Sequence, residues 1–341
     1  MKGALLALGL AFTASAVPAA EPAKPLFAGD ELIRITIRGP IGQVASAEDR
    51  SRIVAATLTS GADSLPIRLS PRGITRLRKE TCQFPPLRVD FAGAPPATSL
   101  FAGQRRLKLV THCRPGEGFQ QHLLLEYAAY RLYNQMTPLS FRVRLAQIDY
   151  QEDSGRAVTS RLGFFIEDLG DVAARNDMRE AQVGARIPVS TLVPADAGRF
   201  GVFQYLISNI DWAMQAGPAG DNCCHNSRLI SASGSPPYST IPYDFDYSGF
   251  VDAPYAVPPE GIRVSNVKVR LYRGFCRHNG EALKAAAAIR ALQPTLLSVL
   301  GQVPQLRAGT LRRASSFLQR SFADIASDQL VTEKLLKTCI G

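Results

Sequence analysis

The stretch Pro242-Tyr243-Asp244-Phe245-Asp246-Tyr247-Ser248-Gly249 contains two aspartates that are separated by one residue and surrounded by aromatic side chains. Burying two carboxylates is costly unless a cation accompanies them. In a strand both side chains point to the same face, so one metal ion can bind both. The alternative is an Asx-rich turn that ends at Gly249. The pattern favours a metal site made by Asp244 and Asp246.

Two residues of opposite charge lie upstream, on different predicted elements. Lys108 stands in the apolar strand sequence Leu-Lys-Leu-Val, and Glu126 follows eighteen residues later on an amphipathic helix. A strand cation and a carboxylate on the following helix can form an ion pair that orients nucleotide phosphates. For either residue alone, the alternative is an ordinary surface lysine or an ordinary glutamate on a helix face.

A third candidate is the segment Asn209-Ile210-Asp211-Trp212, with Asn226 fifteen residues after Asp211. A carboxylate in this place can accept the proton of a hydroxyl substrate. An asparagine oxygen can serve as a ligand of Mg²⁺. The alternative is a helix terminus, where asparagine and aspartate are common.

The order of the predicted elements indicates an α+β fold with two lobes. Apolar and polar residues alternate, or apolar runs are bounded by turn residues, in seven predicted strands: 33–37, 53–59, 65–70, 87–91, 106–112, 141–148 and 161–167. Between them, residues 119–134 carry the apolar stripe of a helix. Residues 200–208 and most of the chain beyond Gly274 also read as helical. We therefore predict a β-rich N-lobe over 31–168 with one key helix, and a mainly helical C-lobe over 169–341.

These parts, in this order, resemble the spore-coat-protein-H (CotH) kinase family, a divergent branch of the protein-kinase-like superfamily. The resemblance extends from about residue 65 to residue 250. It is carried by residues 67–73 (Ile-Arg-Leu-Ser-Pro-Arg-Gly), 87–91 (Leu-Arg-Val-Asp-Phe), 107–109 (Leu-Lys-Leu), 125–132 (Leu-Glu-Tyr-Ala-Ala-Tyr-Arg-Leu), 164–168 (Phe-Phe-Ile-Glu-Asp) and 242–246 (Pro-Tyr-Asp-Phe-Asp). The sequence departs from a kinase pattern in having no Gly-x-Gly-x-x-Gly loop, since its Gly116-x-Gly118 pair follows the lysine strand.

The resemblance implies a role for each candidate residue in binding ATP. Lys108 and Glu126 would position the phosphates. Glu167 ends the strand that leads to the hinge, where adenine would stack. Asp211 falls where the family has its catalytic-loop aspartate, and so would serve as the base.

The resemblance also implies a Mg²⁺ site. Asn226 falls at the position of the family's metal-binding asparagine, and Asp244 would hold the ion. Asp246 would act as an auxiliary or structural carboxylate. Together these roles describe an exported kinase-like phosphotransferase that uses ATP and Mg²⁺ on a protein or envelope substrate.

Two other functions stay open for the same residues. One is a catalytically inactive, pseudokinase-type binding module of the cell envelope, which the missing glycine loop favours. The other is a metal-dependent hydrolase that uses Asp211, His225, Asp244 and Asp246.

The first twenty residues have the features of a cleavable signal peptide, because one lysine precedes a short apolar run that is followed by small residues. The run is too short to cross a bilayer, which takes about twenty residues. We predict a signal peptide over 1–20, a flexible leader over 21–30, and export to the periplasm or the medium. No later segment is apolar enough for us to expect a transmembrane helix.

Six cysteines follow the predicted signal peptide, which favours disulfide bonds in an exported chain. A Cys82–Cys113 bond would join two N-terminal strands, and a Cys276–Cys339 bond would tie down the C-terminal helices. The spacing alone leaves the pairing open. The alternative is a zinc site, made by Cys223, Cys224, His225, Cys276 and His278.

The chain carries a formal net charge of +10, so its surface attracts anions. No dense block of lysine and arginine appears, and we expect a charge that keeps the protein soluble rather than a nucleic-acid site. The expected partner is an anionic group or a protein of the envelope.

Overall fold

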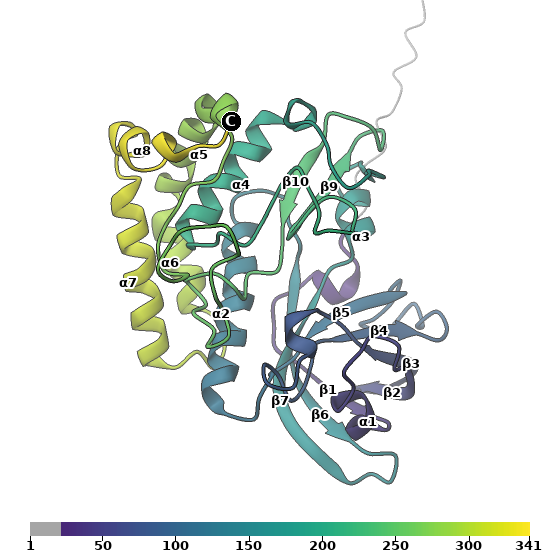
Figure 1. Cartoon of the computed structure of the whole chain (residues 1–341). Helices are drawn as coiled ribbons and strands as arrows, with labels where there is room; N and C mark the ends of the chain where they lie inside the picture. Colours follow the sequence, from purple (N-terminus) through teal and green to yellow (C-terminus); the bar gives the residue numbers. More distant parts are fainter. Residues whose placement is uncertain (1–21) are drawn as a thin grey trace, which may run out of the picture.

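The structure is a computed structural model that describes residues 22–341 (Figure 1). The predicted signal peptide lies outside the described residues. Seven strands form a closed barrel in the order β1-β2-β3-β4-β5-β7-β6. They are β1 (Ile33–Arg38), β2 (Val54–Ser60), β3 (Asp63–Pro71), β4 (Leu87–Phe91), β5 (Arg106–Val110), β6 (Val143–Gln151) and β7 (Ala157–Ile166). The parallel pairing of β1 with β6 closes the barrel, and the other neighbours are antiparallel.

The barrel interior is filled by the apolar side chains of alternate strand positions. Leu69 of β3 lies opposite Val89 of β4, and Val89 lies opposite Leu107 of β5. All three side chains are buried in one apolar cluster. The outward positions carry the polar residues, so the period-two pattern read from the sequence predicts these strands to within a few residues.

Eight α-helices lie in the described part of the chain: α1 (Ile41–Ala45), α2 (Glu117–Asn134), α3 (Leu169–Ala174), α4 (Pro194–Leu206), α5 (Asn279–Ala291), α6 (Gln293–Gly301), α7 (Ala308–Asp324) and α8 (Asp328–Lys334). Helix α2 contacts β6 and β7 on one side and α6 on the other, so it joins the barrel to the helical half (Figure 1). No single helix among residues 22–341 is long and apolar enough to cross a membrane, although the pair Cys276–Ala291 and Gln293–Gly301, bent by 56°, meets that test together.

A small second sheet has the order β10-β9-β8, made by β8 (Arg179–Glu180), β9 (Ser227–Ser231) and β10 (Ser239–Pro242). Strands β9 and β10 are antiparallel, with Ser227 opposite Pro242. At the open end of this hairpin the Tyr243 N–H donates a hydrogen bond of 3.2 Å to the Asn226 carbonyl. The residues just before β9 and just after β10 are thereby held side by side.

The prediction of an α+β fold is confirmed. The largest apolar cluster contains Phe164 of β7, Tyr130 of α2 and Phe245, together with side chains of the C-terminal helices. This one core runs from the barrel wall into the helical half. The division into two lobes at residues 168 and 169 stays a prediction.

The expected flexible leader over residues 21–30 packs against the barrel where the structure describes it. Pro25–Phe27 forms a short 3-10 helix, whose Leu26 and Phe27 side chains are buried in the barrel core. Lys24 forms a 2.6 Å ion pair with Asp171. The flanking prolines and alanines suggested mobility, but burying a leucine and a phenylalanine outweighs the cost of ordering this short segment.

Three disulfides are present: Cys82–Cys113, Cys223–Cys224 and Cys276–Cys339. The first and third are the pairs suggested from the sequence, and both are confirmed. The described residues contain no free cysteine. The zinc hypothesis is therefore wrong, because the thiolates that it needs are all consumed in disulfides.

Candidate functional site

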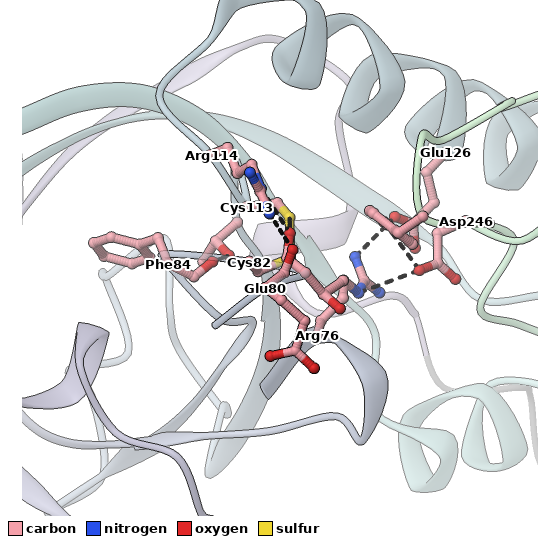
Figure 2. Close-up of a disulfide and its surroundings, with 11 residues drawn as sticks. Arg76, Glu80, Cys82, Phe84, Cys113, Arg114, Glu126 and Asp246 are labelled. Carbon is pink, nitrogen blue, oxygen red and sulfur yellow. Dashed lines mark hydrogen bonds and ion pairs between the residues drawn. A yellow bond between two sulfur atoms is a disulfide. The ribbon is translucent and has the colours of Figure 1, made fainter. Parts of the chain in front are cut away.

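Three carboxylates converge on one arginine, Arg76. The guanidinium of Arg76 contacts Glu126 through Nη1 (3.3 Å to Oε2), Asp244 through Nη2 (3.1 Å to Oδ1) and Asp246 through Nε (3.2 Å to Oδ2). Figure 2 shows this guanidinium between the Cys82–Cys113 disulfide and the side chains of Glu126 and Asp246. One oxygen of each carboxylate lies within 4.8 Å of an oxygen of the other two. We call Glu126, Asp244 and Asp246 the acidic triad.

The triad is assembled from elements that are far apart in the sequence. Glu126 lies on the buried side of α2, and the two aspartates follow β10. Asp244 has a left-handed backbone (φ 62°), which aspartate tolerates better than most residues. Its N–H donates a 2.8 Å hydrogen bond to the Tyr130 hydroxyl. The segment is irregular rather than the strand we considered, yet both carboxylates still reach one cation.

The loop between β3 and β4 delivers Arg76. It contains a short 3-10 helix, Thr75–Leu77, and it is held by the Cys82–Cys113 disulfide. Arg114 donates to the carbonyls of Thr81 (2.9 Å) and Glu80 (Figure 2). These bonds attach the loop to the residues that follow β5, next to the start of α2.

The charge within the triad is only partly balanced, because one guanidinium faces three carboxylates. Burial raises the pKa of Glu126, and the nearby Asp246 and Asp244 add to the effect against the opposing influence of Arg76. Burial likewise raises the pKa of Asp246. Burial alone would lower the pKa of Arg76, but the carboxylates of Asp246 and Glu126 hold it well above its usual range. The site therefore favours additional positive charge.

Arg76 takes the place beside Glu126 where we expected Lys108. The Lys108 ammonium lies instead over aromatic rings, 5.1 Å from the ring centre of Tyr243 and 5.7 Å from that of Phe141. Burial, together with the nearby Arg72 and Arg228, lowers the pKa of Lys108 to about 7. The predicted Lys108–Glu126 ion pair is wrong because the β3–β4 loop brings a longer cation to the glutamate.

A second cation also contacts Tyr243. The Arg228 guanidinium lies 4.6 Å from the centre of the Tyr243 ring and donates a 2.7 Å hydrogen bond to its hydroxyl. Tyr243 directly precedes Asp244. Two cations thus gather on the aromatic residue next to the triad, where they attract an anion.

Asp211 and Asn226 are brought together as the sequence suggested. Asn226 Nδ2 donates to the carbonyl of Asp211 (2.7 Å) and to its Oδ2 (2.9 Å). His225 Nε2 lies 2.8 Å from Oδ1 of Asp211, and this hydrogen bond raises the pKa of His225. The carboxylate of Asp211 is therefore oriented on both oxygens. Its charge also acts on Asp246, whose pKa it helps to raise.

Several basic side chains lie near Lys108 on the outer face of the barrel. Arg88 lies opposite Lys108 in the β4–β5 pair, and Asp90 lies between Arg68 and Arg106 on the same face. A groove of about 880 Å³ lies over Arg68, Arg88 and Arg106. Its lining contains five basic and three acidic residues: Lys24, Arg68, Arg88, Arg105, Arg106, Asp90, Asp168 and Asp171. Asp90 pairs with Arg88 and Arg106, and Lys24 pairs with Asp171, so the groove has a small excess of positive charge.

Glu167 does not belong to the site as predicted. Its Oε1 accepts a 2.9 Å bond from Arg175 Nε, and its Oε2 accepts from the Arg142 N–H (2.9 Å) and from Arg175 Nη2 (3.1 Å). The side chain is 1% exposed. This buried ion pair fixes the end of β7 and leaves no carboxylate oxygen for a nucleotide.

The four residues proposed for a metal-dependent hydrolase lie in two separate groups. His225 contacts Asp211, whereas Asp244 and Asp246 meet Glu126 and Arg76. The sequence reasoning missed Arg76, Arg228 and the role of Tyr243. The sequence indicated Arg76 only indirectly, because two buried aspartates need a cation. It did not indicate whether that cation is a metal ion or a side chain.

Comparisons with known proteins found similarity to solved structures alone. No family model matches the sequence, and no curated protein matches it significantly. The CotH resemblance therefore stays a prediction. The solved structure of the Helicobacter pylori proinflammatory kinase CtkA is similar with a TM-score of 0.39 and 12% identity, over 73% of this chain and 92% of that chain. A similarity of this size defines neither a common fold nor a common activity.

Proposed function

We propose that this protein binds ATP with Mg²⁺ and transfers its terminal phosphoryl group to a hydroxyl of a protein or envelope substrate. The observation that carries the proposal is the pairing of Asp211 with Asn226 beside Asp244. The Asn226 side chain donates a hydrogen bond to Asp211. The backbone carbonyl of Asn226 accepts a hydrogen bond from the N–H of Tyr243, the residue before Asp244. A proton acceptor and a metal-ligating group are thus held in one small region.

The residues present fit a magnesium ion by the chemistry of their donors. Carboxylate and amide oxygens are the ligands that Mg²⁺ prefers, and Asp244, Asp246 and Asn226 offer them. The metal would neutralise charge on the phosphates. Asp211 would accept the proton of the attacking hydroxyl, because its carboxylate is already oriented by Asn226 and His225.

The phosphates of the nucleotide would meet cations from the barrel and from the small second sheet, Lys108 of β5 and Arg228 of β9. Lys108 and Arg228 both lie over the Tyr243 ring, and Arg88, which lines the groove, is opposite Lys108 in the β4–β5 pair. A bound anion would keep Lys108 protonated and so offset the effect of its burial. Phosphoryl transfer needs little beyond such positioning and charge neutralisation.

Nucleotide binding tests the proposal directly. We expect Mg-ATP to raise the melting temperature of the purified protein, and Asp244→Asn to remove most of this rise. Asp252→Asn is the matched control, because Asp252 also has a left-handed backbone (φ 54°) and is half exposed, eight residues away. The proposal fails if Mg-ATP gives no shift, or if both variants respond like the wild type.

The alternative of an inactive binding module has one observation in its favour. Arg76 already occupies the space between the three carboxylates, as a side chain would in a protein that has lost its metal. The disulfides are compatible with the predicted export, and such a module would bind an anionic partner in the envelope. Tight binding of ATP without metal, or of an anionic polymer without ATP, would favour this alternative.

A further inference from the structure

The guanidinium of Arg76 lies among three carboxylates, in the position that a bound metal ion would take. Each of its three guanidinium nitrogens Nη1, Nη2 and Nε faces a different carboxylate, at 3.1 to 3.3 Å. The Arg76 and Asp246 side chains are 9% and 6% exposed, and Glu126 is 2% exposed. Asp244 is the accessible member, with 35% of its side chain exposed. Solvent therefore reaches the triad at Asp244.

The guanidinium does not satisfy the carboxylates completely. It supplies one positive charge to three acidic groups, whereas a divalent ion supplies two. The second oxygen of Glu126, Oε1, is buried and has no hydrogen-bond partner among the described residues. A buried acceptor without a partner is costly, and a metal ion could be reached by both oxygens of this carboxylate.

We propose that Arg76 is an internal plug of a divalent-cation site made by Glu126, Asp244 and Asp246, so that Arg76 and the metal exclude each other. A cation bound within reach of the three carboxylates would lie where the guanidinium now lies, and two positive centres in that volume would repel each other. The metal therefore binds when Arg76 withdraws. This site shares Asp244 and Asp246 with the metal site of the function proposed above and has Glu126 in addition, and its link to nucleotide rests on that function.

The withdrawal of Arg76 requires a movement of the β3–β4 loop alone. Upstream of Arg76 lie Gly73, with a left-handed φ of 97°, and Ile74, whose side chain is 60% exposed. Downstream, the Cys82–Cys113 disulfide fixes the rest of the loop. Leu77, directly after Arg76, is buried, so the motion is expected in the residues that precede it.

Metal binding without nucleotide tests the plug. Mn²⁺ and Mg²⁺ binding is measured by calorimetry for the wild type, Arg76→Gln and Arg78→Gln. Glutamine keeps polar atoms at position 76 but no charge, and Arg78 is the matched control because it is exposed on the same loop. We expect Arg76→Gln to bind Mn²⁺ at least tenfold more tightly than the wild type, with Arg78→Gln unchanged. Mn²⁺ should also raise the melting temperature of Arg76→Gln more than that of the wild type.

Equal Mn²⁺ affinity in Arg76→Gln and the wild type would overturn the proposal, as would the lack of metal binding by folded Arg76→Gln. If this variant does not fold without metal, Arg76→Lys keeps all three carboxylates and one positive charge but cannot contact each carboxylate through a separate nitrogen; it must then bind Mn²⁺ more tightly than the wild type. A variant that binds metal without any effect of ATP would support the plug and refute the proposed function. Nucleotide binding with no difference in metal affinity would do the reverse.

Discussion

Replacing Lys108 by methionine tests whether the Lys108 ammonium over the Tyr243 and Phe141 rings is largely shielded from water. Methionine keeps the length of the apolar stem and removes the ammonium. The Lys108 pKa is lowered from 10.5 to about 7 by burial, and by Arg72 and Arg228. The folded chain therefore binds fewer protons than the unfolded chain between these two pH values, so folding becomes more favourable as the pH rises through this window.

The magnitude follows from the same numbers. A pKa difference of one unit corresponds to about 1.4 kcal/mol, so a change from 10.5 to about 7 sets a ceiling of about 5 kcal/mol on the cost of keeping Lys108 charged. The side chain keeps some contact with solvent, which screens this cost. We expect the gain of Lys108→Met over the wild type to be ~1–2 kcal/mol larger at pH 6 than at pH 9.

Urea unfolding at pH 6, 7, 8 and 9 measures this difference for the wild type, Lys108→Met and Lys284→Met. Lys284 is the control, because it is exposed on α5 and forms only a surface ion pair with Glu281. Its variant should follow the wild type across the range. A Lys108→Met advantage that does not change with pH would refute the reasoning, since it would mean that Lys108 is solvated like Lys284.

Three further changes probe the triad and the core. Glu126→Gln removes a carboxyl whose pKa is raised to about 8 in the folded chain, so the wild type loses stability as the pH rises towards that value. In urea unfolding the variant should therefore gain about 1 kcal/mol or more relative to the wild type between pH 5 and pH 8. An equal difference at both pH values would contradict this. Cys82→Ser/Cys113→Ser opens a link across 31 residues, so we expect a loss of about 3–4 kcal/mol in the same assay, and an unchanged midpoint would show that the bond does not constrain the chain. Phe245→Ala removes a ring with its centre 4.6 Å from that of Tyr130 and 5.6 Å from that of Phe203, which should cost about 3–5 kcal/mol; a loss below about 1 kcal/mol would place the ring outside the core.

Most of the barrel could be predicted because strand signals are local. The period-two alternation around Leu87–Phe91 predicts that strand with its observed bounds, and the apolar stripe of 119–134 predicts α2 to within two residues. Short elements escaped this reasoning. Strand β9 lies in a stretch rich in glycine, serine and asparagine, and its pairing with β10 and β8 supplies what its own propensity does not.

The candidate site was predicted in its residue types more than in its contacts. Asp211 and Asn226 are fifteen residues apart and close through one loop, so their pairing follows from nearby sequence. The predicted role of Glu167 in nucleotide binding is wrong because its carboxylate forms an ion pair with Arg175. Nothing in the spacing of the two residues shows that both are buried.

The sequence alone determined that Asp244 and Asp246, set among aromatic residues, need a positive charge beside them. The reason is general, because carboxylates lose their hydration when the segment is buried. Only the tertiary structure decided which charge that is. Arg76 is 50 residues from Glu126 and 168 from Asp244, and it reaches both because barrel closure and the Cys82–Cys113 bond direct the β3–β4 loop to the triad. An ion pair depends on distance in space, and the distance between these residues exists only after the chain has folded.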